Sequence, residues 1–360
     1  MALSYTLEVL LKQIVKYKAS DLHIVAGTPP QLRIDGKLQA LNLDPLTPDD
    51  TINLLYSVLT EKDKIELEEN LELDFAFDLP GIARFRANYY YQMGSLAGAF
   101  RIIPERPLSL DELGSPAIFK ELVKKEKGLI LVTGPTGSGK STTLAAMINE
   151  INENYNKHIL TMEDPVEFVH KHKKSLISQR SVGKDTKSFA NAIKYALRED
   201  PDVILVGEMR DKETIGAAIT AAETGHIVFG TLHTNSAVQT INRIIDVFPA
   251  EEQAQIRTQL SMGLVAIISQ ALLPKIGGGR FAAQEIFINN PAIANLIREN
   301  KINQLYSQMQ LNQSKTGMQT QTQVLIEAVK KGIITKETAL AYSTKVDELQ
   351  KALANIVWKI

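Results

Sequence analysis

A glycine-rich segment in the middle of the chain limits its fold more than any other feature. It reads, with the residue that follows, Gly134, Pro135, Thr136, Gly137, Ser138, Gly139, Lys140, Ser141 and Thr142. The pattern G-x-x-x-x-G-K-[ST] forms a phosphate-binding loop when it joins a strand to a helix. The apolar run at residues 129–132 and the helical pattern at residues 142–151 provide that strand and helix. The chain therefore contains a strand–loop–helix unit of an α/β fold.

The residue types of this loop explain how it would hold a nucleotide. Glycines let the backbone curl until successive N–H groups point inward at phosphate oxygens, and the next helix adds its positive N-terminal end. Lys140 would neutralise the β- and γ-phosphates, and the Ser141 hydroxyl would complete the coordination of Mg²⁺. A chance loop of this composition would lack the correct flanking elements. The sequence therefore predicts ATP and Mg²⁺ as cofactors.

Two regions of the chain differ in their hydrophobic pattern. From about residue 118, short apolar runs alternate with helical patterns such as residues 189–197. This alternation predicts a mostly parallel sheet that is covered on both faces. After Ala282 the pattern predicts helices, with Ile293 and Ile297 on one stripe. The apolar runs lie at residues 129–132, 159–162, 203–206 and 227–229.

The first hundred residues follow a different pattern. Leucines at positions 3, 7, 10 and 11 predict an amphipathic helix. Residues 73–103 alternate between apolar and polar side chains, which predicts an antiparallel meander with turns at Pro80-Gly81 and Gly94-Ser95. Together with residues 21–38, these elements predict an α+β domain.

The pattern change places the predicted domain boundaries. A chain of 360 residues is long enough for about two domains. Residues 1–103 form the predicted N-terminal domain, and residues 104–116, with three prolines, form the predicted linker. Residues 117–360 form the predicted nucleotide-binding domain, which ends in helices.

Acidic residues follow two of the predicted strands. The strand at residues 203–206 leads to Glu208, and the strand at residues 159–162 leads to Glu163. The carboxyl ends of parallel strands line the ligand crevice. Glu208 is therefore expected to orient or deprotonate the attacking water, and Glu163 to help hold Mg²⁺ or water. The alternative is a buried strand that happens to end at an exposed glutamate, but two such acids favour hydrolysis over a passive nucleotide switch.

Two histidines, His226 and His233, flank the strand at residues 227–229. They could suggest a metal site, but the strand separates them and the chain has no cysteine. His233 is predicted to be a polar group that forms a hydrogen bond near the γ-phosphate. For His226 a purely structural role is equally well supported.

Phosphoryl transfer also needs positive charge on the transition state, often from an arginine. The meander offers Arg84, Arg86 and Arg101 on the face opposite its core residues. For a single molecule, ordinary surface arginines are the better interpretation. The catalytic interpretation requires a ring of subunits that brings this face to the nucleotide of a neighbour.

The composition excludes several kinds of partner. The absence of cysteine excludes disulfides and thiolate metal sites. A net charge of −1 gives no electrostatic reason to bind nucleic acid, and the lysines at residues 124–127 and 171–174 are interpreted as solvated surface. The most apolar later stretch, residues 263–268, is too short to cross a bilayer, so membrane association is expected only through a partner.

In their order along the chain, these motifs resemble the secretion and pilus traffic ATPases of the P-loop superfamily. Among these ATPases, the chain is most similar to the type IV pilus retraction ATPases, and the resemblance covers nearly the whole sequence. Residues 231–246 and 317–320 resemble the retraction type specifically. The other matching motifs lie at residues 20–23, 163–168, 198–211 and 224–235.

This resemblance implies a PAS-like N-terminal domain and a RecA-like C-terminal ATPase domain, assembled as a homo-hexamer with nucleotide bound where the domains meet. It implies that Arg86 and Arg101 reach phosphate. It also implies a cytoplasmic motor, peripheral at the inner membrane, that docks on the platform protein of the pilus machine. Such a motor acts on pilin indirectly and powers twitching motility, without direct nucleic-acid contact or membrane insertion.

One departure from the family lies in a C-terminal helix associated with retraction. At the third position of residues 292–299 this chain has Ala294, where the family usually has an arginine. ATP hydrolysis is not expected to depend on this residue. Contact with a partner is expected to depend on it. The glycine-rich residues 275–280 are predicted to form a flexible loop.

Three alternatives differ in function. Extension and type II secretion ATPases generally carry an additional N-terminal domain, and many bind zinc through four cysteines, for which this chain has neither room nor cysteine. The near-neutral charge disfavours a conjugation-type or DNA-translocating ATPase. A regulator that binds ATP without hydrolysing it is disfavoured by Glu163 and Glu208, and a turnover assay separates it from a motor.

Overall fold

The structure is a computed structural model that describes residues 3–34, 37–104, 106–311 and 313–354. The chain divides into an N-terminal unit (Met1–Arg106 with Pro165–Val169) and a C-terminal unit (Pro107–Asp164 with His170–Ile360). The domain boundaries at residues 103 and 117 stay predictions. Some residues of the predicted domains and linker lie outside the described part, namely 1–2, 35–36, 105, 312 and 355–360.

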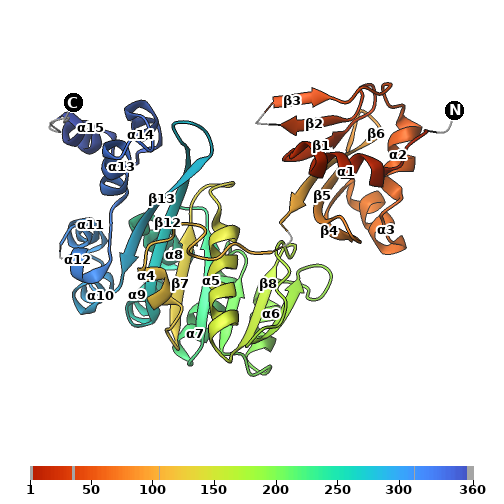
Figure 1. Cartoon of the computed structure of the whole chain (residues 1–360). Coiled ribbons are helices and arrows are strands. Elements are labelled where there is room, and N and C mark those ends of the chain that lie inside the picture. The colour runs from red at the N-terminus through yellow and green to blue at the C-terminus, as the bar shows by residue number, and fades with distance from the viewer. Residues whose placement is uncertain (1–2, 35–36, 105, 312, 355–360) are drawn as a thin grey trace. The chain divides into compact units, whose positions relative to one another are not determined.

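The N-terminal unit is an antiparallel sheet with the strand order β3-β2-β1-β6-β5-β4 (Figure 1). Leucines of its helices pack with Phe85, Tyr89 and Phe100 of the sheet in one core. The strands are β1 (Asp21–Ile24), β2 (Gln31–Ile34), β3 (Lys37–Ala40), β4 (Glu72–Leu79), β5 (Ala83–Gln92) and β6 (Ser95–Ile103). The helices are α1 (Leu7–Tyr17), α2 (Pro48–Tyr56) and α3 (Glu61–Asn70).

The predicted meander is confirmed as β4, β5 and β6, which pair antiparallel in sequence order. Two details differ from the prediction. The first helix begins at Leu7 rather than Leu3, because the Thr6 side chain accepts a hydrogen bond from the backbone N–H of Val9 and caps the helix there. The second turn is centred on Met93-Gly94, which both have positive φ, so Ser95 is already the first residue of β6.

The C-terminal unit contains a sheet with the strand order β13-β12-β7-β11-β10-β8-β9. All neighbouring strands are parallel except β12 and β13, which form an antiparallel hairpin. The predicted mostly parallel sheet is therefore confirmed. The strands are β7 (Gly128–Thr133), β8 (His158–Glu163), β9 (Leu176–Ser181), β10 (Val203–Val206), β11 (Ile227–Leu232), β12 (Leu264–Pro274) and β13 (Arg280–Ile288).

Helices cover both faces of this sheet, as predicted. On one face, α4 (Ile118–Leu122) and α5 (Lys140–Asn154) pack against Ile130 and Val132 of β7. On the other face, Leu129 and Leu131 of β7 join a second core with the remaining helices. Those helices are α6 (Phe189–Ala196), α7 (Lys212–Glu223), α8 (Ala237–Asp246), α9 (Ala250–Gly263) and α10 (Pro291–Arg298).

The prediction of helices after Ala282 is wrong for the first residues of that segment. Residues 283–287 belong to β13, and all five are buried. A strand buried on both faces shows no alternation that would distinguish it from a helix in sequence. The helices begin only at α10, where Asn290 caps the first turn and Pro291 occupies its first position.

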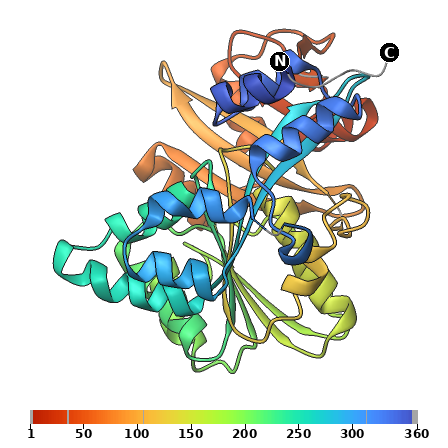
Figure 2. The same ribbon diagram turned by 90° about the vertical axis from the view of Figure 1, so that its left-hand side faces the viewer.

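The C-terminal helices pack on the β12–β13 hairpin. Leu325, Leu349 and Leu353 share a core with Leu273 of β12 and Ala283 of β13. In Figures 1 and 2 these blue helices lie along the cyan hairpin. The helices of this core are α13 (Gln321–Lys330), α14 (Lys336–Tyr342) and α15 (Val346–Ala354). Before them, η1 (Ile302–Gln304) and α11 (Leu305–Met309) join the core on the α6–α10 face, and α12 (Gln313–Thr316) follows α11.

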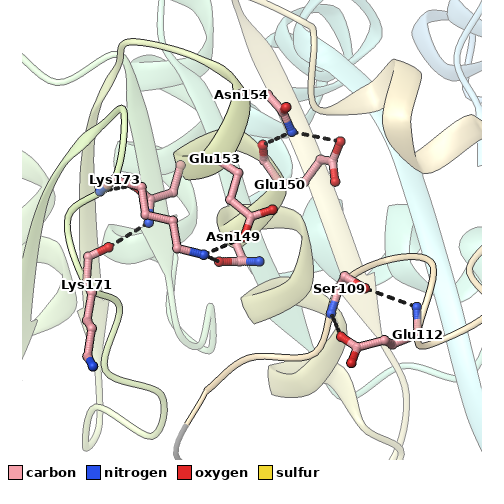
Figure 3. A network of polar contacts seen from close by, with 9 residues as sticks. Ser109, Glu112, Asn149, Glu150, Glu153, Asn154, Lys171 and Lys173 are labelled. Atoms are coloured by element: carbon pink, nitrogen blue, oxygen red, sulfur yellow. Dashed lines mark hydrogen bonds and ion pairs between the residues drawn. The ribbon is translucent and has the colours of Figure 1, made fainter.

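The basic segment at residues 171–174 is tied to the C-terminal half of α5 (Figure 3). The Lys173 ammonium donates to Asn149 Oδ1 at 3.0 Å and pairs with Glu153, while Asn152 Nδ2 donates to the Lys171 carbonyl at 2.8 Å. This lysine cluster is thus partly neutralised by the helix it contacts. In the part of the chain that the structure describes, no helix is long and apolar enough to span a membrane.

Candidate nucleotide-binding site

The phosphate-binding loop lies between β7, which is buried along its whole length, and α5. Gly139 has φ 86° and precedes the first residue of α5, so the helix begins directly at Lys140. The Lys140 ammonium donates to the carbonyls of Gly134 at 2.8 Å and Pro135 at 3.0 Å. The loop therefore combines a cation with the N-terminal end of a long helix, which is the arrangement that binds phosphate.

Two glycines of the loop serve different purposes. A Cβ at Gly134 would lie 2.2 Å from the Gln270 carbonyl oxygen and 2.6 Å from Ser138 Oγ, so the close packing beneath the loop requires glycine. At Gly137, with φ 78°, nothing lies within 4 Å of such a Cβ. The loop is thus tightly packed on its inner side and open at its tip, where a ligand can approach the backbone.

A buried amide supports the loop from below. Gln270 of β12 is only 4% exposed, and its Nε2 donates to the Ser138 carbonyl at 2.6 Å. Its Oε1 accepts from Thr143 Oγ1, in the first turn of α5, at 2.9 Å. The sequence prediction did not include Gln270, although Ser269 and Gln270 are polar residues directly after the apolar run at residues 263–268.

Glu208 and His233 meet at neighbouring strand ends. Glu208 follows β10 and His233 follows β11, which pairs with both β10 and β7. His233 Nε2 lies 2.9 Å from Glu208 Oε1, and Arg210 Nε contacts the same oxygen. The hydrogen bond to Glu208 raises the pKa of Arg210, which stays charged. The structure therefore joins an imidazole, a carboxylate and a guanidinium at the edge of the sheet where the loop also lies.

Glu163 lies farther along the same edge. It is the last residue of β8, and its Oε1 accepts from Thr161 Oγ1 at 2.7 Å and from Gln179 Nε2 at 3.3 Å. In the strand order, β8 is separated from β7 by β10 and β11. Three strand spacings, or about 14 Å, thus lie between these strands. The structure brings Glu163 to the predicted edge, where Thr161 of its own strand and Gln179 of β9 donate to it.

The donor set fits a magnesium ion held mainly by a nucleotide. Ser141 is exposed in the first turn of α5 and offers one hydroxyl oxygen. Mg²⁺ commonly takes one or two protein ligands together with phosphate oxygens and water. Among the described residues, no group of three histidine or acidic side chains could hold a metal ion alone.

His226 lies at the opposite end of β11 from His233. It precedes the strand, and its Nδ1 lies 3.0 Å from the Ala221 carbonyl oxygen at the end of α7. The strand between the two histidines keeps them apart, in agreement with the argument from the sequence. His226 therefore belongs to the packing of α7 against β11 and not to the candidate site.

The arginines of the meander form a cross-strand pair. Arg86 of β5 and Arg101 of β6 are directly opposite each other. Arg86 binds Asp74 at 2.6 Å and Glu167 at 2.9 Å, and Arg101 binds Asp21 at 2.8 Å. The hydrogen bond with Asp74 raises the pKa of Arg86, and Glu167 raises it further. The carboxylates offset the repulsion that two opposed arginines would otherwise produce.

Known proteins resemble the chain along nearly its whole length. Residues 2–354 match the family described as "Type II/IV secretion system protein". The chain is 54% identical over 330 residues to the type IV pilus retraction ATPase PilT of Pseudomonas aeruginosa, covering 92% of this chain and 96% of that protein. It is 52% identical over 338 residues to a twitching motility protein of Neisseria gonorrhoeae, covering 94% and 90%.

A solved structure supports the same assignment. The crystal structure of the pilus retraction motor PilT with bound ADP matches with a TM-score of 0.89 and 54% identity, covering 96% of this chain and 98% of that chain. The predicted fold class, an α/β protein with an N-terminal α+β part and a C-terminal P-loop ATPase part, is confirmed. The chain belongs to the family of type II/IV secretion system proteins and, within it, to the type IV pilus retraction ATPases.

Proposed function

We propose that this chain hydrolyses ATP as a motor subunit and thereby powers the retraction of type IV pili. One observation carries the hydrolytic part: Glu208 and His233 are 2.9 Å apart at the sheet edge that also bears the phosphate-binding loop. A protein that only binds ATP needs the loop but has no use for a joined carboxylate and imidazole there. The relatives named for pilus retraction and twitching motility supply the cellular process.

In this proposal, residues 134–142 bind the substrate. Backbone N–H groups of the loop and the Lys140 ammonium hold the β- and γ-phosphates of ATP. The Ser141 hydroxyl is the ligand that the chain offers to Mg²⁺, which neutralises negative charge on the phosphates when it is bound. Thr142 extends the first turn of α5, whose N-terminal end faces the same anion.

Glu208 orients the attacking water and accepts its proton. Its contacts with His233 and Arg210 are both made through Oε1, which leaves Oε2 as the oxygen for the water. His233 fixes the carboxylate and stands next to the γ-phosphate. Glu163 ends β8, the strand next to β10, and helps to hold Mg²⁺ or its water at the same edge of the sheet.

Arg86 and Arg101 supply positive charge to the transition state from a neighbouring subunit. Arg101 is suited to this role because 70% of its side chain is exposed although it is bound to Asp21. An arginine that acts on the nucleotide of a neighbouring subunit requires a ring of subunits, so we propose a homo-hexamer. The ring acts in the cytoplasm and docks on the inner-membrane platform protein of the pilus machine. It moves pilin indirectly, and it neither contacts nucleic acid nor inserts into the membrane.

A turnover assay tests this function directly. The purified protein is expected to hydrolyse ATP, and Glu208→Gln to bind ATP while its turnover falls at least about a hundredfold, the usual contribution of a general base. Glu213→Gln changes an exposed acid in the first turn of α7 and serves as the matched control, which keeps wild-type turnover.

The outcomes separate the alternatives. Hydrolysis that persists in Glu208→Gln would move the role of general base to Glu163. ATP binding without hydrolysis by the wild-type protein at every concentration would favour the regulator instead. In cells, twitching motility should be lost with Glu208→Gln and retained with Glu213→Gln.

A further inference from the structure

A chain of buried glutamine side chains begins directly below the phosphate-binding loop. Gln270 binds the loop through the Ser138 carbonyl and α5 through Thr143 Oγ1. Directly opposite Gln270 in the β12–β13 register is Gln284, which is 6% exposed. Gln284 Nε2 donates to Gln270 Oε1 at 2.9 Å. Both hydrogen-bonding groups of the Gln270 amide are therefore in use, which fixes its orientation.

The chain continues to the segment before α13. The backbone carbonyl of Gln284 accepts a hydrogen bond from Gln319 Nε2 at 2.7 Å. The backbone of Gln319 also exchanges two hydrogen bonds with Ile286 of β13, at 2.8 and 3.0 Å. Thr320, the next residue, caps α13 in a capping box with Gln323. The path thus runs from the phosphate-binding loop to the first turn of α13 through Gln270, Gln284 and Gln319.

Glu285, the neighbour of Gln284 on β13, holds the same helix start. Its carboxylate is buried and accepts from the N–H of Gln321 at 3.4 Å and from the N–H of Ala237 at 2.8 Å. Gln321 is the first residue of α13, and Ala237 is the first residue of α8, three residues after Thr234. The start of α13 is therefore bound by Gln284 and Glu285, two successive residues of β13. The same strand reaches the phosphate-binding loop through the contact of Gln284 with Gln270.

These contacts give a role to residues 317–320, which the proposed mechanism does not use. The segment leads into the first turn of α13 and is anchored on β13 by backbone and side-chain hydrogen bonds. Because these hydrogen bonds join the loop to Gln319, a shift of the loop on phosphate binding would change the bonding of Gln270 and, through it, of Gln284 and Gln319.

We propose that Gln270 is a positioning residue of the phosphate-binding loop, and that the Gln270–Gln284–Gln319 chain couples nucleotide binding to the docking of α13. Gln270 acts through the loop and does not touch the substrate. The inference rests on the proposed nucleotide site and adds a regulatory connection to it. Coupling between two sites is reciprocal. A change that weakens the packing of α13 on β13 therefore weakens nucleotide binding, and nucleotide binding strengthens that packing.

The test combines ADP affinity with hydrogen exchange of the full-length protein. Gln270→Met keeps the side-chain length and removes the amide, and Gln319→Met does the same at the other end of the chain. Gln253→Met is the matched control, because Gln253 is half-buried as Gln319 is and its Nε2 also donates to a backbone carbonyl, that of Phe248, but it lies on α9 outside the path. Thermal unfolding and mass measurements confirm that each variant is folded and assembled as the wild type is.

The proposal predicts a distinct pattern. ADP affinity falls about tenfold in Gln270→Met and about threefold in Gln319→Met. A tenfold change in affinity corresponds to about 1.4 kcal/mol of binding free energy. It stays at the wild-type value in Gln253→Met. In the wild type, ADP slows exchange of the α13 amides, and this slowing is lost in Gln270→Met. When Gln270→Met and Gln319→Met are combined, the loss of binding free energy is smaller than the sum of the two single losses, because both changes interrupt the same path.

Two results would overturn the inference. One is α13 exchange in the wild type that does not respond to ADP although the loop amides do. The other is an equal loss of affinity in Gln319→Met and Gln253→Met, which would indicate general destabilisation. A wild-type protein that binds no ADP would overturn the nucleotide site itself, so failure of the proposed function is distinguishable from failure of the coupling.

Discussion

The phosphate-binding loop of the C-terminal unit and the arginine pair of the N-terminal unit are held in different ways. Below the loop, Gln270 is 4% exposed and makes neutral hydrogen bonds within the core. On the N-terminal sheet, Arg101 is bound by an ion pair while 70% of its side chain is exposed. A buried hydrogen bond is costly to break. The Arg101–Asp21 pair is exposed on one side only: Asp21 is 7% exposed and also accepts a hydrogen bond from Ser20 Oγ, whereas the Arg101 guanidinium is open to water.

This difference suggests a division between a rigid and an adjustable part. The loop must present its N–H groups in one geometry for phosphate, and buried contacts hold that geometry in advance. An arginine that serves a neighbouring subunit must leave its own carboxylate at one stage of the cycle. The exposed Arg101 guanidinium can exchange Asp21 for phosphate, and Asp21 then keeps its hydrogen bond from Ser20 Oγ.

The largest effect is expected at the rigid part. Lys140→Ala removes the cation of the loop and should abolish tight ATP binding, measured by calorimetry with the intact protein. Lys125→Ala removes an exposed lysine from the cluster at residues 124–127 and should bind ATP as the wild type does. Unchanged affinity in Lys140→Ala would contradict the assignment of the loop.

The adjustable part is tested next. Arg101→Ala should lower turnover by about a thousandfold, the lower limit for an arginine finger, without lowering ATP affinity in proportion. Arg84→Ala changes an arginine of the neighbouring strand β5 that pairs with Asp78, and this control should retain turnover. Mixing Arg101→Ala with Lys140→Ala subunits should restore part of the activity, because each supplies what the other lacks. No recovery in mixed rings would exclude action between subunits.

Two glycine variants sharpen the contrast within the loop. In Gly134→Ala the new Cβ would lie 2.2 Å from the Gln270 carbonyl oxygen, so the free energy of unfolding should fall by about 3 kcal/mol. In Gly137→Ala nothing lies within 4 Å of the new atom, and only the cost of a positive φ remains, about 1 kcal/mol. Chemical denaturation measures both. Equal losses would show that the loop is not held from below.

An effect smaller than that of Gly134→Ala concerns pH. Burial lowers the pKa of His170 from 6.5 to about 4, with Lys173 adding to the shift. The unfolded chain therefore binds the proton first, and stability is lost as the pH falls from 6.5 toward 4. Between pH 7 and pH 5 the loss is about 2 kcal/mol. His170→Gln should remove this part of the pH dependence of unfolding, and an unchanged pH profile would show that the imidazole is not held neutral.

The sequence predicted the parts of the site that are local. The phosphate-binding loop, Glu208 and Glu163 each stand directly after an apolar run, so their place at the sheet edge follows from one segment. β12 and β13 were missed as strands because their burial is nearly continuous and alternation is absent. Gln270 was missed because its contact with Ser138 spans 132 positions, and only the folded sheet brings the two together.

ATP hydrolysis across a protein concentration series, with the mass of the assembly measured in parallel, tests the central claim most directly. The account predicts turnover that rises as hexamers form, because Arg86 and Arg101 then reach the nucleotide of a neighbour. Steady ATP binding without hydrolysis at every oligomeric state would contradict it and would leave a nucleotide-binding regulator in place of a motor.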